Sequence, residues 1–196
     1  MPPADQNQQD AIELLKADHR DVEKLFEQFE QTQDENQKVA IAEHICLTLK
    51  VHTQIEEEIF YPALRDKIAE KDVDEALVEH QAAKDLIAEI EDVGEVDDMY
   101  EARVHVLGEQ ISHHVKEEEE ELFPEAQKAG VDTAGLGPRM AERKAELLRD
   151  YESDLAGGGI RSERKSFTGG ADLRPDEPDG GPVEGAGKHQ DSDARE

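Results

Sequence analysis

The sequence predicts an all-α protein: an up-down-up-down four-helix bundle built from a duplicated helical hairpin, with a short fifth helix and a disordered C-terminal tail. Three observations lead to this expectation. Helix-forming residues such as Ala, Leu, Glu, Lys and Gln dominate the first 155 positions. Apolar side chains there recur at intervals of three and four residues, the period of one helix face. Nine of the 14 glycines lie from Gly157 onward.

The first two helices each carry a histidine among their apolar positions. The first is expected over residues 8–31, with His19 in the middle of its apolar face. The second is expected over residues 34–68, with His52 in the corresponding place. A kink is expected at Pro62, because proline has no N–H and its ring clashes with the preceding turn.

The next three helices complete the expected bundle. The third begins near Asp72 and has His80 on its apolar face, and the fourth covers residues 96–129 and has His114 there. A shorter fifth helix is expected over residues 138–155. Because short connections make sequential helices antiparallel, the first four form an up-down-up-down bundle.

The spacing of the four histidines indicates a duplication. His19 and His52 are 33 residues apart, and His80 and His114 are 34 apart, so the first helical hairpin resembles the second. We assign residues 8–155 to the bundle domain. Residues 156–196 form a polar tail rich in glycine and proline, which has too little apolar surface to offset the entropy of ordering and is expected to be disordered.

Two stretches with the same design hold the main functional signal. They are HTQIEEEIFYP at residues 52–62 and HHVKEEEEELFP at residues 113–124. When residues are counted back from each proline, His52 aligns with His114 and Glu56 aligns with Glu118. A glutamate four residues after a histidine lies one turn along the same helix face.

These side chains are expected to meet at one level of the core. Four neutral imidazoles and two carboxylates suit a pair of divalent transition-metal ions, with the carboxylates bridging them. A hydrogen-bonded core histidine would explain each histidine singly, but burying two carboxylates without compensation is costly, and a metal removes that cost. The predicted metal ligands are therefore His19, His52, Glu56, His80, His114 and Glu118.

Neighbouring polar residues are assigned other places. Glu57, Glu58 and the remaining glutamates around Glu118 are expected to form a solvated acidic face, with Glu119 kept as the alternative ligand to Glu118. Tyr61 fits either a hydrogen bond near the site or packing at the kink. His44, His105 and His113 are expected on the surface.

Composition excludes several classes of function. The chain has 22 Lys and Arg against 50 Asp and Glu, a formal charge of -28, which disfavours nucleic acid and anionic membranes as partners. One cysteine permits neither an intramolecular disulfide nor a thiolate metal cluster. No apolar stretch approaches the ~20 residues of a membrane span, and the N-terminus has no signal region, so a cytoplasmic protein is expected.

These motifs resemble those of a known family. Together with the doublets DH at Asp18–His19 and EH at Glu79–His80, the two histidine–glutamate stretches are similar to the hemerythrin-like, HHE cation-binding domain family, over about residues 8–130. The resemblance implies a four-helix bundle with a non-haem di-iron centre held by the six predicted ligands. Oxygen-carrying hemerythrins have two histidines one turn apart on the third helix. Here Ala76 and Lys84 flank His80 at that distance, a departure that argues against simple oxygen carriage.

The leading hypothesis from the sequence is a bacterial-type hemerythrin-like protein. Its centre, with two iron ions or other divalent metals, would bind O2 or a related small ligand such as NO or peroxide, in sensing, scavenging or redox protection. Two alternatives remain open: a di-iron enzyme that turns over peroxide or NO, and a metal-stabilised scaffold whose tail binds a protein partner. A turnover assay with H2O2 separates the leading hypothesis from the enzyme.

Overall fold

The protein is described by a computed structural model covering residues 9–65, 67–92 and 99–156. Within these residues all regular secondary structure is helical, so the predicted all-α class is confirmed. Residues 157–196, where the sequence predicts a tail, lie outside the described residues. The elements are α1 (Ala11–Gln31), α2 (Glu35–Ile55), η1 (Glu56–Phe60), α3 (Tyr61–Leu64), α4 (Glu70–Asp92), α5 (Tyr100–Glu117), η2 (Glu118–Leu122), α6 (Phe123–Lys128) and α7 (Thr133–Ala156).

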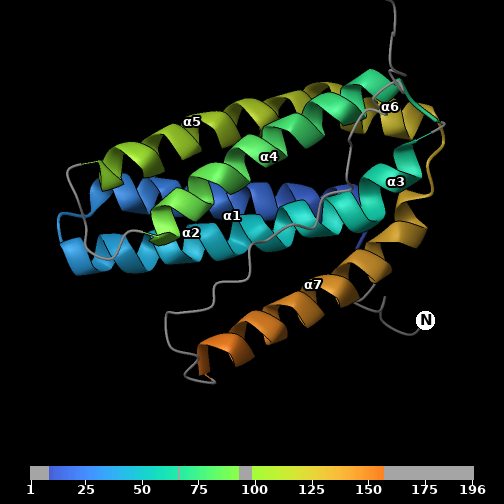
Figure 1. Cartoon of the computed structure of the whole chain (residues 1–196). Coiled ribbons are helices and arrows are strands. Elements are labelled where there is room, and N and C mark those ends of the chain that lie inside the picture. The colour runs from blue at the N-terminus through green and yellow to red at the C-terminus, as the bar shows by residue number, and fades with distance from the viewer. Residues whose placement is uncertain (1–8, 66, 93–98, 157–196) are drawn as a thin grey trace, which may run out of the picture. The chain divides into compact units, whose positions relative to one another are not determined.

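Four long helices form the bundle. Helix α1 packs on α2 and α4 packs on α5, and contacts of α1 with α5 and of α2 with α4 join the two hairpins (Figure 1). An aspartate caps the N-terminus of each helix in the first hairpin. On α1, Asp10 accepts a hydrogen bond from the Ile12 N–H at 2.9 Å, and on α2, Asp34 accepts one from the Gln37 N–H at 2.9 Å. Such caps satisfy N–H groups that have no partner within the helix.

The expected kink at Pro62 takes the form of a widened turn, and the same turn recurs before Pro124. Segments η1 and η2 are π-helical: the Tyr61 N–H bonds to the Glu56 carbonyl, five residues back, and Phe123 repeats this contact in the second hairpin. Proline lacks an N–H and its ring collides with the carbonyl four residues earlier, so a wider turn accommodates it. Both predicted ligand glutamates stand at the first position of these turns.

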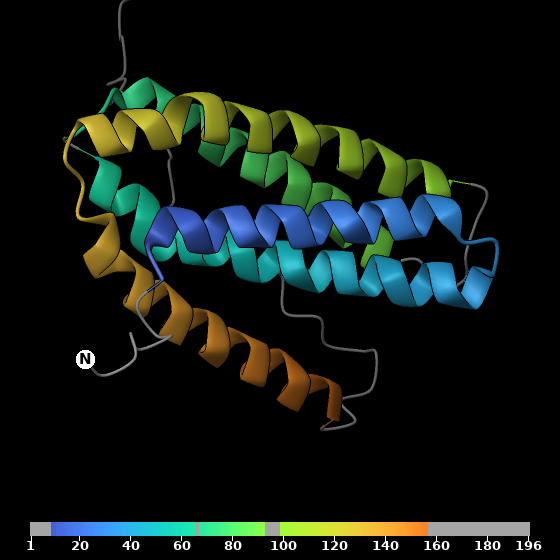
Figure 2. The same ribbon diagram turned by 180° about the vertical axis from the view of Figure 1, so that it is seen from behind.

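Helix α7 differs from its predicted bounds, since it begins at Thr133 and contains Pro138 in its interior. Its start is determined upstream of the proline. Asp132 accepts a hydrogen bond from the Gly135 N–H at 3.0 Å, and the Thr133 hydroxyl donates to Asp10 at 2.6 Å. The helix lies along α1 and α2 in both views (Figures 1 and 2), where Met140 is fully buried.

The apolar core is divided into two clusters, and the four histidines lie between them. One cluster contains Leu15, Ile55 and the side chains from α7; the other contains Val22, Leu49 and most of the α4–α5 contacts. Along α1 and α4 the histidine separates buried residues of one cluster from buried residues of the other. A polar layer therefore crosses an otherwise apolar bundle. No helix within the described ranges has both the length and the apolar character that crossing a membrane requires.

Candidate metal centre

The six predicted ligands lie together in this polar layer. Each long helix contributes its histidine, and η1 and η2 each contribute their first residue as a glutamate. None of the six is more than 5% exposed, and Glu56 is fully buried. Burying two carboxylates and four imidazoles this deeply requires partners that neutralise their charge and satisfy their polar atoms.

The Glu56 carboxylate spans the two helical hairpins. Its Oε2 atom lies 3.2 Å from His52 Nε2 on its own helix and 3.4 Å from His80 Nε2 on α4. The imidazoles of the centre are arranged in two pairs, one from each hairpin: ring centroids are 4.9 Å apart for His19 and His52, and 4.7 Å apart for His80 and His114. Glu56 therefore contacts one member of each pair.

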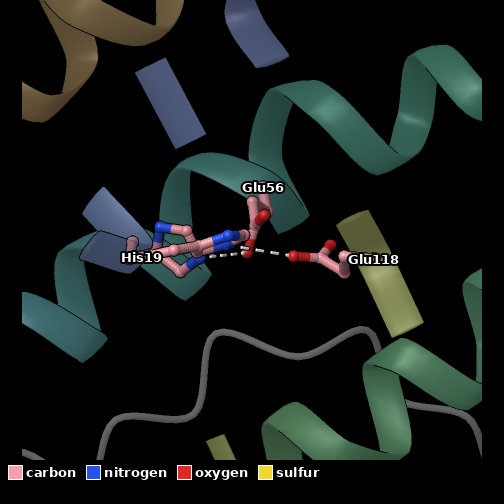
Figure 3. Close-up of side chains that lie close together, drawn as sticks. His19, Glu56 and Glu118 are labelled. Carbon is pink, nitrogen blue, oxygen red and sulfur yellow. Dashed lines mark ion pairs between the residues drawn. The ribbon is translucent and has the colours of Figure 1, made fainter. Parts of the chain in front are cut away.

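Glu118 repeats this arrangement from the opposite hairpin. Its Oε2 atom lies 3.3 Å from His19 Nε2 and 3.6 Å from His114 Nε2. Figure 3 shows the carboxylates of Glu56 and Glu118 converging with the His19 imidazole from separate helices. Each of the two carboxylates lies beside both imidazole pairs, so each could be shared between two metal ions.

The donor atoms form two overlapping groups in which all atoms lie within 4.8 Å of one another. Glu56 belongs to both groups, which places it between them. Each group has the size of a metal coordination sphere completed by water or a further ligand. One group is His19, His52, Glu56 and Glu118, and the other is Glu56, His80 and His114.

Unpartnered polar atoms at the centre show that these residues fit a metal. Both carboxylate oxygens of Glu56, Oε2 of Glu118 and Nε2 of His19 and His52 are buried without a hydrogen-bond partner. A buried polar atom left unpaired costs free energy, and a divalent cation would satisfy all of these atoms together. Imidazole and carboxylate donors suit iron, manganese and zinc alike, so the donor set alone does not select the metal.

The two buried carboxylates have pKa values shifted in opposite directions. Burial, and then the charge of Glu118, raises the pKa of Glu56 well above its ordinary value. For Glu118 burial also opposes ionisation, but His114 and His19 outweigh it and hold the pKa below its usual range. This divergence is expected of two like charges in one buried site.

The pKa values of the histidines also respond to burial. Burial lowers the pKa of His80 to about 4 and that of His52 below its ordinary value. For His114 burial acts in the same direction, but Glu118 and Glu79 outweigh it and raise the pKa. His80 and His52 are therefore neutral at neutral pH, the form in which imidazole binds metals.

Each histidine turns its second ring nitrogen, Nδ1, toward a carboxylate on the neighbouring helix. The contacts run around the bundle in one direction: α1 to α2, η1 to α4, α4 to α5, and η2 back to α1. We call these four acidic residues the carboxylate ring. Its contacts are Asp18 Oδ2 to His52 at 3.7 Å, Glu57 Oε1 to His80 at 3.0 Å, Glu79 Oε2 to His114 at 2.8 Å, and Glu119 Oε1 to His19 at 2.9 Å.

The carboxylate ring can orient the imidazoles. Three of its contacts are within hydrogen-bond distance, so Nδ1 carries the proton and Nε2 is left free to face the centre. The ring members stay ionised: burial would raise the pKa of Glu57, but His80 and Lys84 hold it below its ordinary value. Asp18, whose contact is too long for a hydrogen bond, is also paired with Lys144 from α7.

Two ring members differ from their sequence-based assignment. Glu57 was expected on a solvated face, but its side chain is 11% exposed and lies 2.6 Å from the Lys84 ammonium as well as beside His80. Glu119, the alternative ligand, contacts the outer nitrogen of His19, whereas Glu118 occupies the inner position. The sequence does contain a signal for the carboxylate ring, because its members recur at the same positions in both hairpins. An acidic residue precedes the histidine of the first helix in each hairpin, and another follows the ligand glutamate of the second helix.

Tyr61 fulfils both roles that the sequence left open, since it is packed in the core and also forms hydrogen bonds at the site. It is 1% exposed, its hydroxyl donates to Glu118 Oε1 at 2.9 Å, and the hydroxyl oxygen lies 3.1 Å from His80 Nε2. The corresponding residue of the second hairpin is Phe123, which stacks on His19 at 5.9 Å. The duplication is therefore broken at this position, where one hairpin has a tyrosine hydroxyl group and the other has a phenylalanine. His44, His105 and His113 are exposed, as expected.

Comparison with known proteins places these features in a family context. The family model for the hemerythrin HHE cation binding domain matches residues 10–126. A protein of Nostoc sp. (strain PCC 7120 / SAG 25.82 / UTEX 2576) described as a DNA nickase is 31% identical over 158 residues, which cover 80% of this chain and 44% of that protein. The chain thus spans less than half the length of this relative.

A solved structure supports the fold. The crystal structure of a hemerythrin HHE cation binding domain-containing protein from Mycobacterium kansasii aligns with a TM-score of 0.63 at 22% sequence identity. The alignment covers 79% of this chain and 95% of that one. At this level of identity, the likeness supports the shared fold alone.

Proposed function

Because the chain belongs to the hemerythrin HHE cation binding domain family, we propose that its six buried histidine and glutamate side chains hold two iron ions. Family membership implies a bound metal cation; the number of ions and their identity are our proposal. The observation that carries it is the position of Glu56 and Glu118. Each contacts one histidine from each imidazole pair, so each can share its carboxylate between two ions.

We further propose that the centre binds O2 or a related small ligand, such as NO or peroxide, in sensing, scavenging or redox protection. A narrow cavity with room for about one water-sized molecule lies against His19, His52 and His114. Val22 and Leu49 are among its apolar lining residues. Such a cavity favours a ligand of two or three atoms without net charge. Iron supplies a redox-active ion that binds ligands of this kind.

Turnover of peroxide or NO is the second candidate function, and the position of Tyr61 favours it. Its hydroxyl is buried beside Glu118 and His80, where it can hold a proton next to the centre while the surrounding core excludes water. Phe123 at the matching position has no such group. Rapid loss of added H2O2 that depends on the bound metal would support an enzyme, whereas a stable complex would support sensing or scavenging.

A DNA-cutting function, which the description of the relative from Nostoc raises, is not part of this proposal. The six side chains of the centre are at most 5% exposed, so a DNA phosphate has no access to them. The formal charge of -28 also repels a polyanion.

The stoichiometry of metal binding tests the proposal directly. Protein loaded with ferrous iron without oxygen and then freed of excess metal is expected to retain two iron ions per chain by elemental analysis. Exposure to air is then expected to produce an iron–oxo absorption band that the metal-free protein lacks. One ion per chain at saturation would overturn the two-ion assignment.

Metal is expected to leave as the pH falls from about 6.5 to about 4. Protons compete with metal for imidazole nitrogen, and unperturbed histidine titrates near about 6.5. His114, whose pKa is raised, takes up a proton at a higher pH than His80, whose pKa is about 4. The stability that the metal supplies is therefore present at neutral pH and lost on acidification. Metal content and melting temperature measured across this range check the window, and full retention of metal at pH 4 would contradict histidine ligation.

A further inference from the structure

An acidic groove leads from the protein surface to one side of the centre. It lies between α4 and the continuous helix formed by α5, η2 and α6, which run side by side (Figure 1). It encloses about 540 Å³, part of it open to solvent. Its base is formed by His114 and Glu118, and the acidic residues along its walls include Glu75, Glu79, Glu117, Glu121 and Glu125.

The base of the groove contains an unpartnered buried oxygen. Glu118 is 2% exposed, and its Oε2 atom has no hydrogen-bond partner among the described residues. Lys71 is the only lysine or arginine among the groove's lining residues, and its ammonium is paired with Glu75 at 3.4 Å. The groove thus concentrates negative charge next to a buried carboxylate oxygen that lacks a hydrogen-bond partner, which is an environment suited to a cation.

A second set of donor atoms combines two residues that line the groove, Glu79 and Glu117, with the neighbouring His113. Glu79, His113 and Glu117 each offer one atom, and these atoms all lie within 4.8 Å of one another. The His113 and Glu117 side chains are 65% and 42% exposed, so solvent reaches them. Glu79 also accepts a hydrogen bond from His114 Nδ1 through its other oxygen, at 2.8 Å. It therefore connects the exposed donors to a histidine of the centre.

We propose that the acidic groove is the route by which a hydrated divalent cation reaches the buried centre, with Glu79, His113 and Glu117 holding it on the way. This inference rests on the proposed metal-binding function and adds the path by which the site fills. Carboxylates spaced along the path replace the waters of the cation step by step. The cation is then passed to Glu118, which belongs to both the groove and the centre.

The route has a measurable electrostatic signature. A cleft lined by charge of one sign raises the local concentration of an oppositely charged ligand and raises its association rate by about 10- to 1,000-fold. This effect weakens as salt screens the charges, since the Debye length is about 10 Å at 0.1 M ionic strength. Groove residues remote from the ligands should therefore control how fast metal binds without changing how much binds.

The test compares two matched double variants of the full chain. Glu121→Gln with Glu125→Gln removes two charges from the groove wall, and Glu23→Gln with Glu27→Gln removes two from the exposed face of α1. Both pairs are exposed and four residues apart. Metal-free protein is mixed with cobalt(II) chloride in a stopped-flow instrument, and the visible absorption of bound cobalt follows the filling of the centre. Elemental analysis gives the final cobalt content.

The groove variant is expected to load about tenfold more slowly than the wild type at low salt, the lower end of the steering effect. The difference should shrink at high salt, and the final cobalt content should not change. The α1 variant should load at the wild-type rate. Equal rates for both variants, or equal slowing of both, would overturn the route. So would a lower final cobalt content in the groove variant, because the two residues would then belong to the binding site. A wild-type protein that takes up no cobalt at the centre would instead overturn the proposed function.

Discussion

Replacing Glu56 with glutamine is expected to remove at least half of the bound metal and to stabilise the metal-free protein. The carboxylate is fully buried, both of its oxygens lack hydrogen-bond partners, and it contacts a histidine of each pair. An amide of the same size bridges two cations poorly. Without metal, burial and the charge of Glu118 disfavour the ionised form of Glu56, so a neutral side chain removes an unfavourable interaction.

The pH dependence of this gain follows from the raised pKa of Glu56. When the pKa of a group is higher in the folded protein than in the unfolded chain, the free energy of unfolding decreases as the pH rises above the unfolded pKa. For Glu56 the unfolded pKa is near 4.5. The glutamine variant should therefore be more stable than the wild type at pH 8 in the metal-free form. The two should have similar stability near pH 4, where Glu56 is protonated in both states. Chemical denaturation of metal-free protein at the two pH values measures the difference.

Glu118→Gln and Glu120→Gln complete the comparison. Glu118→Gln should lose metal as Glu56→Gln does, but without the gain in metal-free stability, because His114 and His19 favour the ionised form of Glu118. Glu120 is exposed on the same π-helical segment, so its substitution should leave both metal content and stability unchanged. If all three variants bind two ions with the wild-type spectrum, the ligand assignment is wrong.

Helical periodicity was sufficient to predict the bundle and the layer of histidines. His19, His52, His80 and His114 each recur with the apolar residues of their own helix, so a face buried in the bundle must bury them too. The two glutamates follow by the same rule, because four residues along a helix returns to the same face. These inferences need only local geometry and the presence of a core.

The widened turns and the carboxylate ring depend on contacts that periodicity does not encode. Glu57 follows Glu56 by about 100° around an ordinary helix, a direction that sequence alone assigns to solvent. In a four-helix bundle a side chain that points in that direction can contact the neighbouring helix, and here the Glu57 carboxylate contacts His80. The start of α7 is similarly non-local, since Thr133 bonds to Asp10, 123 residues earlier in the chain.

The carboxylate ring should control metal affinity although none of its members is assigned as a ligand. Glu119 offers the clearest test, because it is 31% exposed and lies outside the acidic groove. Substitution of a carboxylate that orients a ligating histidine typically weakens metal binding about 10- to 100-fold. Glu119→Met, which removes the acceptor for His19 Nδ1, should reach this range, and Glu119→Gln, which keeps one acceptor oxygen, should have a smaller effect.

Glu120→Met is the matched exposed control. Competition with a chelator for cobalt(II) gives the three affinities. If Glu119→Met and Glu120→Met bind metal equally tightly, the contact with His19 has no part in holding the metal, and the Nδ1 carboxylates serve only to join the helices.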